Sequence, residues 1–430
     1  LTNRADRHFD GIIQNDAAAF LVETDGKIFV EPIYGETKIE VRKITGRTQI
    51  DEHAMVVSGL LQFQIRPRVI EETLPISNRG IVGINRPPRD MQPPVEKVIN
   101  IEAPPRPAPK SRISPIMIML PMMMGISMAI FLGNLMFLGM AFFSPLMMIG
   151  NAVENKRNGK KEFKIAKAKY LADIEQAVIG LRQGRREELA IRRVVWPDAS
   201  DCISRIVDSR HDLWDRRRED IDYLSYRVGV GDQVALVSAT IENGGSEDLR
   251  DFGEKKLRRN DPIHLSPLVV SLTHHGAIGV VGERKNSLDV LQWFILQTIT
   301  LHSHRDVSLC AALPNSFAGN FEYMKWVPHV RFGGAEIDEP TIAFGEEKSV
   351  VLFQKIRAVI DSRQASIKHA YGSAALRPPS IVFVVDETVV RDRTSIDAIL
   401  KSGPAVGVYT IFLATQFRDL PGECKAIIDV

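Results

Sequence analysis

The pattern of hydrophobic and polar positions changes several times along the chain and predicts several structural units. Residues 1–75 alternate apolar and polar positions in short runs, such as 27–30 and 60–65, and turn residues separate these runs. This alternation is typical of a small all-β domain. Residues 76–112 contain proline-rich runs, for example 104–109, which favour an extended polyproline II spacer.

Residues 113–153 contain no charged residue. A membrane-spanning helix needs about 20 apolar residues, so this stretch predicts a two-helix transmembrane hairpin, with spans at about 113–132 and 135–153. Basic residues flank it on both sides, at Lys110, Arg112, Lys156, Arg157, Lys160 and Lys161. The positive-inside rule therefore places both flanks in the cytoplasm and the protein in the plasma membrane. The alternative is a buried, methionine-rich core hairpin.

Two further patterns follow the uncharged stretch. Residues 154–220 are predicted to form a cytoplasmic helical stalk, because apolar residues recur there at three- and four-residue steps: Phe163, Ala166, Tyr170, Ile174, Ala177 and Leu181. In 221–430, continuous apolar strands alternate with helices expected at 286–302 and 346–370. The strands lie at 277–281, 307–313, 381–385 and 408–413. This alternation predicts an α/β domain with a parallel sheet that is covered on both faces.

The amino-acid composition excludes some classes of protein but does not identify the class of this one. Hydrophobic residues make up 44% and charged residues 25% of the chain, which is ordinary for globular protein. The net charge of +2 gives no global basic excess that would indicate nucleic-acid binding. The three cysteines lie far apart without a C-x-x-C motif, so neither a disulfide scaffold nor a cysteine zinc site is expected. Because the chain starts at Leu1 and stops inside an apolar run at 426–430, we interpret it as a piece of a longer protein.

One strand-to-helix junction has the position of a phosphate-binding loop, where free N–H groups and the helix dipole attract phosphate. A working loop follows the pattern G-x-x-x-x-G-K-[ST]. Counted from Gly282, the second glycine is replaced by Ser287 and the lysine by Leu288, while Lys285 comes too early and Glu283 would repel phosphate. A degenerate loop is the favoured interpretation, and genuine nucleotide binding is the alternative.

The apolar strand at 381–385 ends in two carboxylates, Asp386 and Glu387, and so has the form of a Walker B strand. In a motor, the first carboxylate would hold the magnesium shell and the second would polarise water. Without a working phosphate loop opposite, the pair has no substrate. Capping of the next helix is therefore the favoured interpretation. We expect no catalytic residue and no cofactor in this chain.

Other patterns carry less information. Residues 229–231 (Gly-Val-Gly) invite a dinucleotide interpretation, but Val234 replaces the next required glycine and no helix is expected there. The histidines at 274–275 and 302–304 have no carboxylate or cysteine at a metal-ligand spacing, so no metal site is expected. The G-x-S-x-G signature of serine hydrolases is absent from the sequence.

Four segments, in their order around the uncharged stretch, resemble those of a known family. They are N-R-P-P-R at 85–89, L-W-D-R-R through G-V-G at 213–231, W-V-P-H at 326–329 and L-P-G-E-C at 420–424. They are similar to the "RpPR", "lWeRr…D.DfL.lR.G.G", "W.PH" and "LP..C" segments of type VII secretion ATPases. These are the EssC/EccC proteins of the FtsK/SpoIIIE superfamily. The resemblance covers roughly residues 80–430.

The resemblance implies more than the residues show alone. It implies that 221–430 is a RecA-like, degenerate P-loop domain. It also implies that this chain is the anchoring and regulatory N-terminal portion of an ATPase whose catalytic domains, with ATP and magnesium, lie downstream. The family further implies a hexameric homo-oligomer, other type VII secretion subunits as partners, and small protein substrates of the WXG100 type. Nucleic acid is not an expected partner.

The N-terminal β region resembles the last part of a forkhead-associated domain, on the strength of residues 44–65. Its phosphothreonine site would need an arginine on a loop, but Arg7-His8 is preceded by Asp6 where that arginine belongs. Charge complementarity to phosphate is therefore missing. Two other functions stay open: a DNA translocase of the FtsK/SpoIIIE kind, and a non-enzymatic membrane receptor or scaffold. DNA translocases usually carry more spans and lack the 214–231 stretch.

Overall fold

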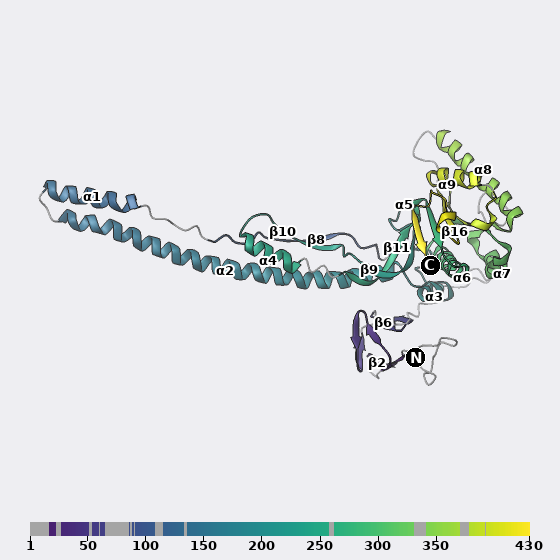
Figure 1. The fold of residues 1–430 in the computed structure, drawn as a ribbon, viewed down its shortest axis with the longest axis horizontal. Coiled ribbons are helices and arrows are strands. Elements are labelled where there is room, and N and C mark those ends of the chain that lie inside the picture. Colours follow the sequence, from purple (N-terminus) through teal and green to yellow (C-terminus); the bar gives the residue numbers. More distant parts are fainter. Residues whose placement is uncertain are drawn as a thin grey trace. The chain divides into compact units, whose positions relative to one another are not determined.

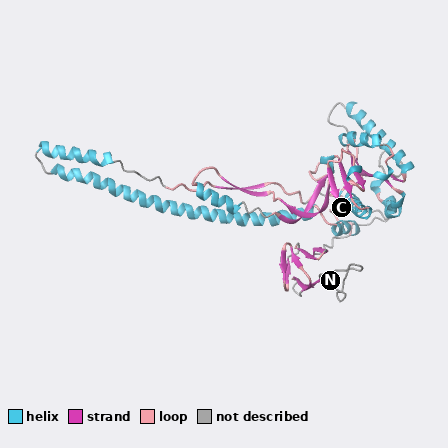
Figure 2. Cartoon of the chain, viewed as in Figure 1, coloured by secondary structure: helices cyan, strands magenta, loops and turns pink. Residues whose placement is uncertain are grey.

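The computed structural model of the chain describes residues 17–22, 27–50, 54–59, 61–64, 86, 88–89, 91–107, 115–132, 136–257, 262–330, 341–369, 378–391 and 393–430. Figure 1 labels the elements, and Figure 2 distinguishes helices from strands. The chain forms two compact units. Unit 1 comprises Leu1–Pro94, Leu189–Gln233 and His264–Val430, and unit 2 comprises Val95–Glu188 and Val234–Ile263. The chain therefore passes from one unit to the other at four points.

The N-terminal part of unit 1 is a small antiparallel β region, as predicted. One sheet has the order β1-β2-β5, with β1 (Ala17–Val22), β2 (Ile28–Tyr34) and β5 (Thr48–Ile50). The other has the order β4-β3-β6-β7, with β3 (Thr37–Ile39), β4 (Arg42–Ile44), β6 (Met55–Ser58) and β7 (Leu61–Gln64). Val30, Ile44, Ile50 and Val56 form its core. The forkhead-associated assignment stays a prediction, and residues 6–8 lie outside the described residues.

Unit 2 is built around a long helix. Its elements are β8 (Lys97–Ile101), α1 (Pro115–Leu132), the 60-residue α2 (Met136–Val195), whose last turns belong to unit 1, β10 (Val237–Ile241) and α4 (Glu247–Leu257). β8 and β10 pair in parallel. Tyr170, Ile174, Ala177 and Leu181 are buried on one face of α2, in one core with Leu249 of α4. The three- and four-residue spacing predicted this face correctly.

Helices are present on both sides of the turn expected within 113–153, as α1 and the first part of α2. Across the part of the chain that the structure describes, no helix combines the length and the apolar character that a membrane crossing requires. The two predicted spans therefore stay a prediction.

The rest of unit 1 is an α/β domain with a six-stranded parallel sheet, which confirms the predicted α/β class. The strand order is β14-β13-β15-β16-β12-β17. The strands are β12 (Ala277–Val281), β13 (Val307–Leu313), β14 (Ile342–Phe344), β15 (Ser380–Asp386), β16 (Val408–Ala414) and β17 (Ala426–Asp429). All residues of β12, β13 and β15 are buried, which explains why these strands are apolar without alternation.

Two hydrophobic cores lie on the two faces of this sheet. Along β15, Ile381, Phe383 and Val385 belong to one core, while Val382 and Val384 belong to the other, because successive side chains in a strand point to opposite faces. The first core includes residues of α8 (Glu346–His369) and α9 (Arg393–Ser402), which lie beside each other in Figure 1. The second includes residues of α6 (Arg284–Leu301) and of β9 (Ser225–Gln233).

Shorter elements complete unit 1. β9 forms a two-stranded sheet with β11 (Ile263–Ser271), and residues 229–231 lie inside β9. The remaining helices are α3 (Ala199–Val207), α5 (Leu272–His275) and α7 (Ala318–Phe321). Short 3-10 turns are η1 (Asn315–Phe317), η2 (Glu322–Trp326), η3 (Pro328–Val330), η4 (Glu387–Val389), η5 (Pro404–Val406) and η6 (Phe417–Asp419).

Candidate functional site

The parallel sheet brings the two nucleotide-type motifs to the same edge. β12 ends at Val281 and is followed by Gly282 and then by α6, while β15 ends at Asp386. β16 lies between these strands, and its register pairs Ala414 with Val281 and Leu413 with Asp386. Open α/β sheets bind their ligands outside the carboxyl ends of the strands. The residues at this edge are therefore the first candidates for a functional site.

A group of charged side chains around the buried Asp386 occupies this edge, and we call it the Arg284 cluster. Arg284 pairs through Nη1 with Asp386 and donates through Nη2 to Glu387 Oε1 at 3.2 Å. Asp386 is fully buried, and its Oδ1 accepts hydrogen bonds from the Thr388 N–H at 2.9 Å and the Thr388 hydroxyl at 2.5 Å. Glu387 Oε1 also accepts from the Thr415 N–H at 2.9 Å and hydroxyl at 2.6 Å. Both carboxylates are thus paired with a cation.

The loop between β12 and α6 lacks the groups that hold a phosphate. Gly282 has a φ of +150°, and a Cβ at this position would lie 2.0 Å from the carbonyl oxygen of Val430. The loop is therefore packed closely against the residue that follows β17. Lys285 is exposed, and the Ser287 side chain is buried with no hydrogen-bond partner for its hydroxyl among the described residues.

The structure thus brings together only some of the predicted site residues. Asp386 and Glu387 contact Arg284, a residue that the sequence analysis did not identify. Lys285, which it did name, lies at the surface. Asp386 also caps η4, in the way that the capping interpretation expects. The sequence signal for Arg284 is a cation at the start of the helix after one strand, together with an acidic pair at the end of another strand. Recognising it required the strand order.

The residues at this edge do not fit a magnesium nucleotide. Such a complex needs a lysine for the β- and γ-phosphates, a backbone cradle and a carboxylate that is free to hold the metal shell. Here the guanidinium of Arg284 is bound to both carboxylates, and the lysine position holds Leu288. The described residues also contain no group of three histidine, cysteine or acidic side chains arranged to hold a metal ion.

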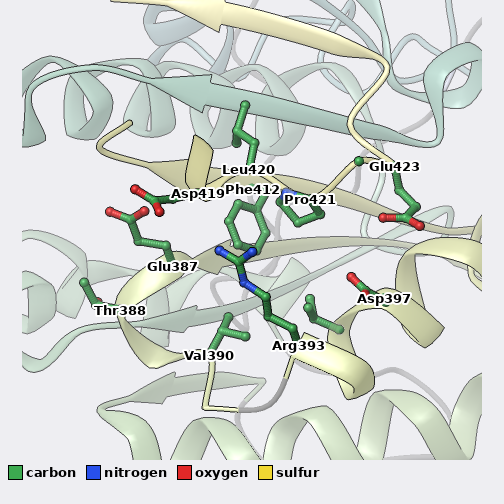
Figure 3. Close-up of a pocket in the computed structure, with 12 residues that line it drawn as sticks. Glu387, Thr388, Val390, Arg393, Asp397, Phe412, Asp419, Leu420, Pro421 and Glu423 are labelled. Carbon is green, nitrogen blue, oxygen red and sulfur yellow. The ribbon is translucent and has the colours of Figure 1, made fainter. Parts of the chain in front are cut away.

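A pocket of about 600 Å³ opens beside the Arg284 cluster, at the carboxyl ends of β15 and β16 (Figure 3). Figure 3 shows the side chain of Arg393, the first residue of α9, extending toward the ring of Phe412. Glu387 belongs to both the pocket and the cluster. The lining comprises Glu387, Thr388, Val390, Arg393, Ile396, Asp397, Phe412, Asp419, Leu420, Pro421, Gly422 and Glu423.

The segments that carry the family resemblance have structural roles at the end of α6. The indole N–H of Trp214 donates to the Ile299 carbonyl at 2.8 Å. The backbone N–H groups of Trp214 and Arg216 donate to the carbonyls of Thr300 and Leu301 at 2.9 and 3.0 Å. The His329 ring packs edge-on against the Trp214 ring, with centroids 6.2 Å apart. The 213–231 and 326–329 segments therefore meet at one place.

The upstream N-R-P-P-R segment joins this place through buried ion pairs. Arg216 is fully buried, with its Nε 3.2 Å from Asp222 Oδ2. Arg89 donates to both oxygens of Asp222, at 2.6 and 2.7 Å. Burial raises the pKa of Asp222, but the hydrogen bonds from Arg89 and the charges of Arg216 and Arg89 outweigh it and hold this pKa below its ordinary value. For the neighbouring Asp215, burial dominates and raises the pKa.

Comparison with known proteins supports the resemblance. No family model matches the chain. The type VII secretion system protein EssC of Staphylococcus aureus (strain NCTC 8325 / PS 47) is 20% identical over 418 residues, covering 94% of this chain and 27% of EssC. The ESX secretion system protein EccC of Geobacillus thermodenitrificans (strain NG80-2) is 20% identical over 264 residues, covering 60% of this chain and 17% of EccC. The chain therefore spans about a quarter or less of the length of these relatives.

Two solved structures of type VII secretion proteins also match. One is the cytoplasmic domain of the Thermomonospora curvata type VII secretion ATPase EccC, with a TM-score of 0.32 and 14% identity over 38% of this chain and 21% of that chain. The other is EssC (ATPases 2 and 3) from Geobacillus thermodenitrificans, with a TM-score of 0.31 and 10% identity over 49% of this chain and 37% of that chain.

The antiparallel β region, the second unit and the six-stranded parallel sheet define a multidomain protein with an α/β domain. Within that class, the chain is a distant homologue of the type VII secretion EssC/EccC ATPases, because the sequence match to EssC extends over 94% of its length at 20% identity. This confirms the resemblance that the four sequence segments indicated.

Proposed function

We propose that this chain is the membrane-anchoring and regulatory N-terminal portion of a type VII secretion ATPase, and that its α/β domain is a pseudo-ATPase. The observation that supports the second part is the Arg284 cluster. A guanidinium bound to Asp386 and Glu387 supplies the positive charge that magnesium and phosphate-binding lysine supply in a motor. The distant homology to EssC supports the first part.

The pseudo-ATPase proposal predicts that the full 430-residue chain does not bind magnesium-ATP at micromolar concentrations. The physical reason is that the phosphates would meet neither a lysine nor a free glycine-rich backbone, while the acidic pair would repel them. Isothermal titration calorimetry in detergent measures this directly. As a matched control, Arg284→Ala removes the cation but leaves the loop unchanged, and it too is expected not to bind. Micromolar binding that is lost on Asp386→Ala would contradict the proposal.

The anchoring part of the proposal is that residues 113–153 insert in the membrane as a helical hairpin with both flanks in the cytoplasm. The absence of charge supports it, and so does the exposure of large apolar side chains, at 72% for Ile116, 95% for Phe131 and 63% for Phe143. Apolar surface of this extent is stable only when lipid or another protein covers it.

Substitution near the centre of the first helix tests this anchor. A charged residue at a helix centre costs about 2.5 to 3.5 kcal/mol of insertion free energy. We therefore expect Met124→Asp to lower the inserted fraction several-fold in a translocon glycosylation assay, while Met124→Leu leaves it unchanged. Release of the wild-type chain from membranes by alkaline carbonate would be the contrary result.

The remaining functions belong to the whole protein. We propose that catalytic domains with ATP and magnesium follow this portion, and that the protein acts as a homo-oligomer, a hexamer in its full-length form. Other type VII secretion subunits and WXG100-type substrates are its proposed partners. Nucleic acid is not among them, because the chain has no basic excess. Tight, salt-dependent binding of duplex DNA in an anisotropy titration would instead favour the DNA translocase alternative.

A further inference from the structure

Two arginines of the N-R-P-P-R segment, Arg86 and Arg89, bind one acidic surface of unit 1. We call this surface the acidic receptor. It consists of the side chains of four aspartates and of two backbone carbonyls. These are Asp215, Asp220, Asp222 and Asp306, and the carbonyls of Trp214 and Arg216.

Arg86 uses three guanidinium nitrogens on the receptor. Its Nε donates to the Trp214 carbonyl at 2.8 Å, its Nη2 to the Arg216 carbonyl at 2.9 Å and its Nη1 to Asp306 Oδ2 at 2.8 Å. Two backbone acceptors and one carboxylate thus match the planar geometry of one guanidinium. Lysine has no equivalent set of donors, so this position selects arginine.

Arg89 occupies a deeper position. Its side chain is 6% exposed and forms the two-pronged contact with Asp222. Asp215 and Asp220 each place a carboxylate oxygen 3.7 Å from the same guanidinium. Two parallel N–H···O bonds between ionised groups are among the stronger and more selective contacts in proteins. Arg89 is therefore the anchor of the segment.

The spacing of the two arginines matches the conformation that the sequence favours. Polyproline II repeats every three residues, so side chains three positions apart lie on the same face. Arg86 and Arg89 are three positions apart with two prolines between them, and both reach the receptor. Proline-rich ligands also lose little conformational entropy on binding, because the chain is already extended.

The receptor is held in place by its own contacts. Asp222 pairs with the buried Arg216, and the Trp214 and Arg216 backbones are bonded to the end of α6. The Tyr223 hydroxyl donates to the Asp306 carbonyl at 3.0 Å. None of these contacts involves Arg86 or Arg89. Other cations nearby, Arg205 at 3.6 Å from Asp215 and Arg218 at 3.5 Å from Asp306, are part of this framework.

We propose that the acidic receptor is a peptide-binding site for two arginines three residues apart in a proline-bearing segment, and that residues 86–89 are its ligand in cis. The same segment supplied in trans, as from a second copy of the chain, fits the site equally well because its sequence is identical. A segment bound in this way couples the region before residues 113–153 to the α/β domain. The inference does not depend on the proposed function.

A competition experiment on the full chain tests the site. The probe is a fluorescein-labelled peptide with the sequence of residues 82–92, titrated in fluorescence anisotropy. The cis ligand is removed in the double variant Arg86→Ala, Arg89→Ala. We expect this variant to bind the peptide at least tenfold more tightly than the wild type, because the tethered segment competes at high effective concentration in the wild type. A peptide in which lysine replaces both arginines is the matched control and should bind at least tenfold more weakly.

Two further variants keep the outcome decisive. Asp306→Asn in the double-variant background should weaken the peptide several-fold, since it removes one contact of Arg86. If the double variant does not fold, as judged by its thermal transition, Arg89→Lys replaces it, because this change keeps the charge and loses only the two-pronged contact. A folded variant whose anisotropy stays flat up to millimolar peptide would overturn the proposal and leave Arg86 and Arg89 with a purely structural role.

Discussion

At the scale of single residues, several deeply buried charges are paired with opposite charges. Arg216 faces Asp222, Arg205 faces Asp201 at 3.1 Å and Asp386 faces Arg284. An unpaired charge in such positions would be several kcal/mol less stable. The carboxylates of Asp386 and Glu387 at the sheet edge are thus paired with the guanidinium of Arg284. A catalytic carboxylate that binds a metal ion would have to be free of such a partner.

Gly282 is required by the closed loop, and its replacement is expected to destabilise unit 1. A Cβ would lie 2.0 Å from the Val430 carbonyl oxygen, and φ of +150° is unfavourable for any other residue. Gly282→Ala should therefore lower the free energy of unfolding by more than about 1 kcal/mol. Urea denaturation measures the change. Gly229→Ala is the matched control, because nothing lies within 4 Å of a Cβ there. Equal effects of the two changes would contradict the close packing of this loop.

His329 should make the stability of unit 1 depend on pH. Burial lowers its pKa to about 4, while its Nε2 lies 2.8 Å from the His302 carbonyl. Between pH 6.5 and 4 the unfolded chain binds a proton that the folded chain does not, so stability present above pH 6.5 falls as pH drops. A shift of this size corresponds to about 3 kcal/mol. Urea midpoints at pH 7.5, 5.5 and 4.5 should fall less steeply for His329→Gln than for the exposed control His274→Gln.

At the scale of elements, glycines determine how closely helices approach in unit 2. A Cβ at Gly253 of α4 would lie 2.5 Å from the Tyr170 hydroxyl oxygen and 2.8 Å from Ile241 Cδ1. A Cβ at Gly180 of α2 would make only an ordinary contact, 3.4 Å from Ile99 Cδ1. The first glycine is therefore needed for packing, whereas the second only lowers helix propensity.

Alanine at these two positions should have opposite effects. Gly180→Ala is expected to stabilise α2 by up to about 1 kcal/mol, because alanine is the better helix former. Gly253→Ala is expected to destabilise the packing of α4 on α2 by about 1 to 3 kcal/mol, because a buried side chain must move. Hydrogen-exchange protection of the α2 and α4 amides separates the two effects. Loss of protection in both variants would show that the α2 position is equally constrained.

A helix or strand could be predicted from the sequence when its pattern was local. It was missed when it depended on a pairing strand far along the chain. The apolar strands 277–281 and 307–313 were predicted with their observed bounds, since a buried parallel strand is apolar by itself. β8 was missed inside the proline-rich linker, because its partner β10 lies far along the chain. The single helix α2 was predicted as two elements, because its composition changes near residue 154 while its helical backbone continues.

The same distinction explains the candidate site. Asp386 and Glu387 were identified because a strand that ends in two carboxylates is a local pattern. Arg284 was not, because its contact with them exists only when β16 lies between β12 and β15. Likewise, Arg89 and Asp222 are separated by 133 positions, and no local pattern links them.

At the scale of the whole molecule, segments of the two units alternate along the sequence. Unit 1 contains three separate segments and unit 2 contains two. Each unit completes its core from residues distant in sequence, as unit 2 does with Tyr170 of α2 and Leu249 of α4. Non-local contacts of this kind close long loops and slow folding. Unit 2 and the α/β domain of unit 1 are therefore expected to acquire their structures together rather than in order of synthesis.

The four passages of the chain between the units also bear on how the protein withstands proteases. When a single linker joins two domains, one proteolytic cut in that linker separates them. Here a cut at any one of the three passages from residue 188 onward leaves the units covalently connected through the others, and the two fragments still share a hydrophobic core. Nicked molecules should therefore migrate as intact particles in native gels and separate into fragments only under denaturing conditions.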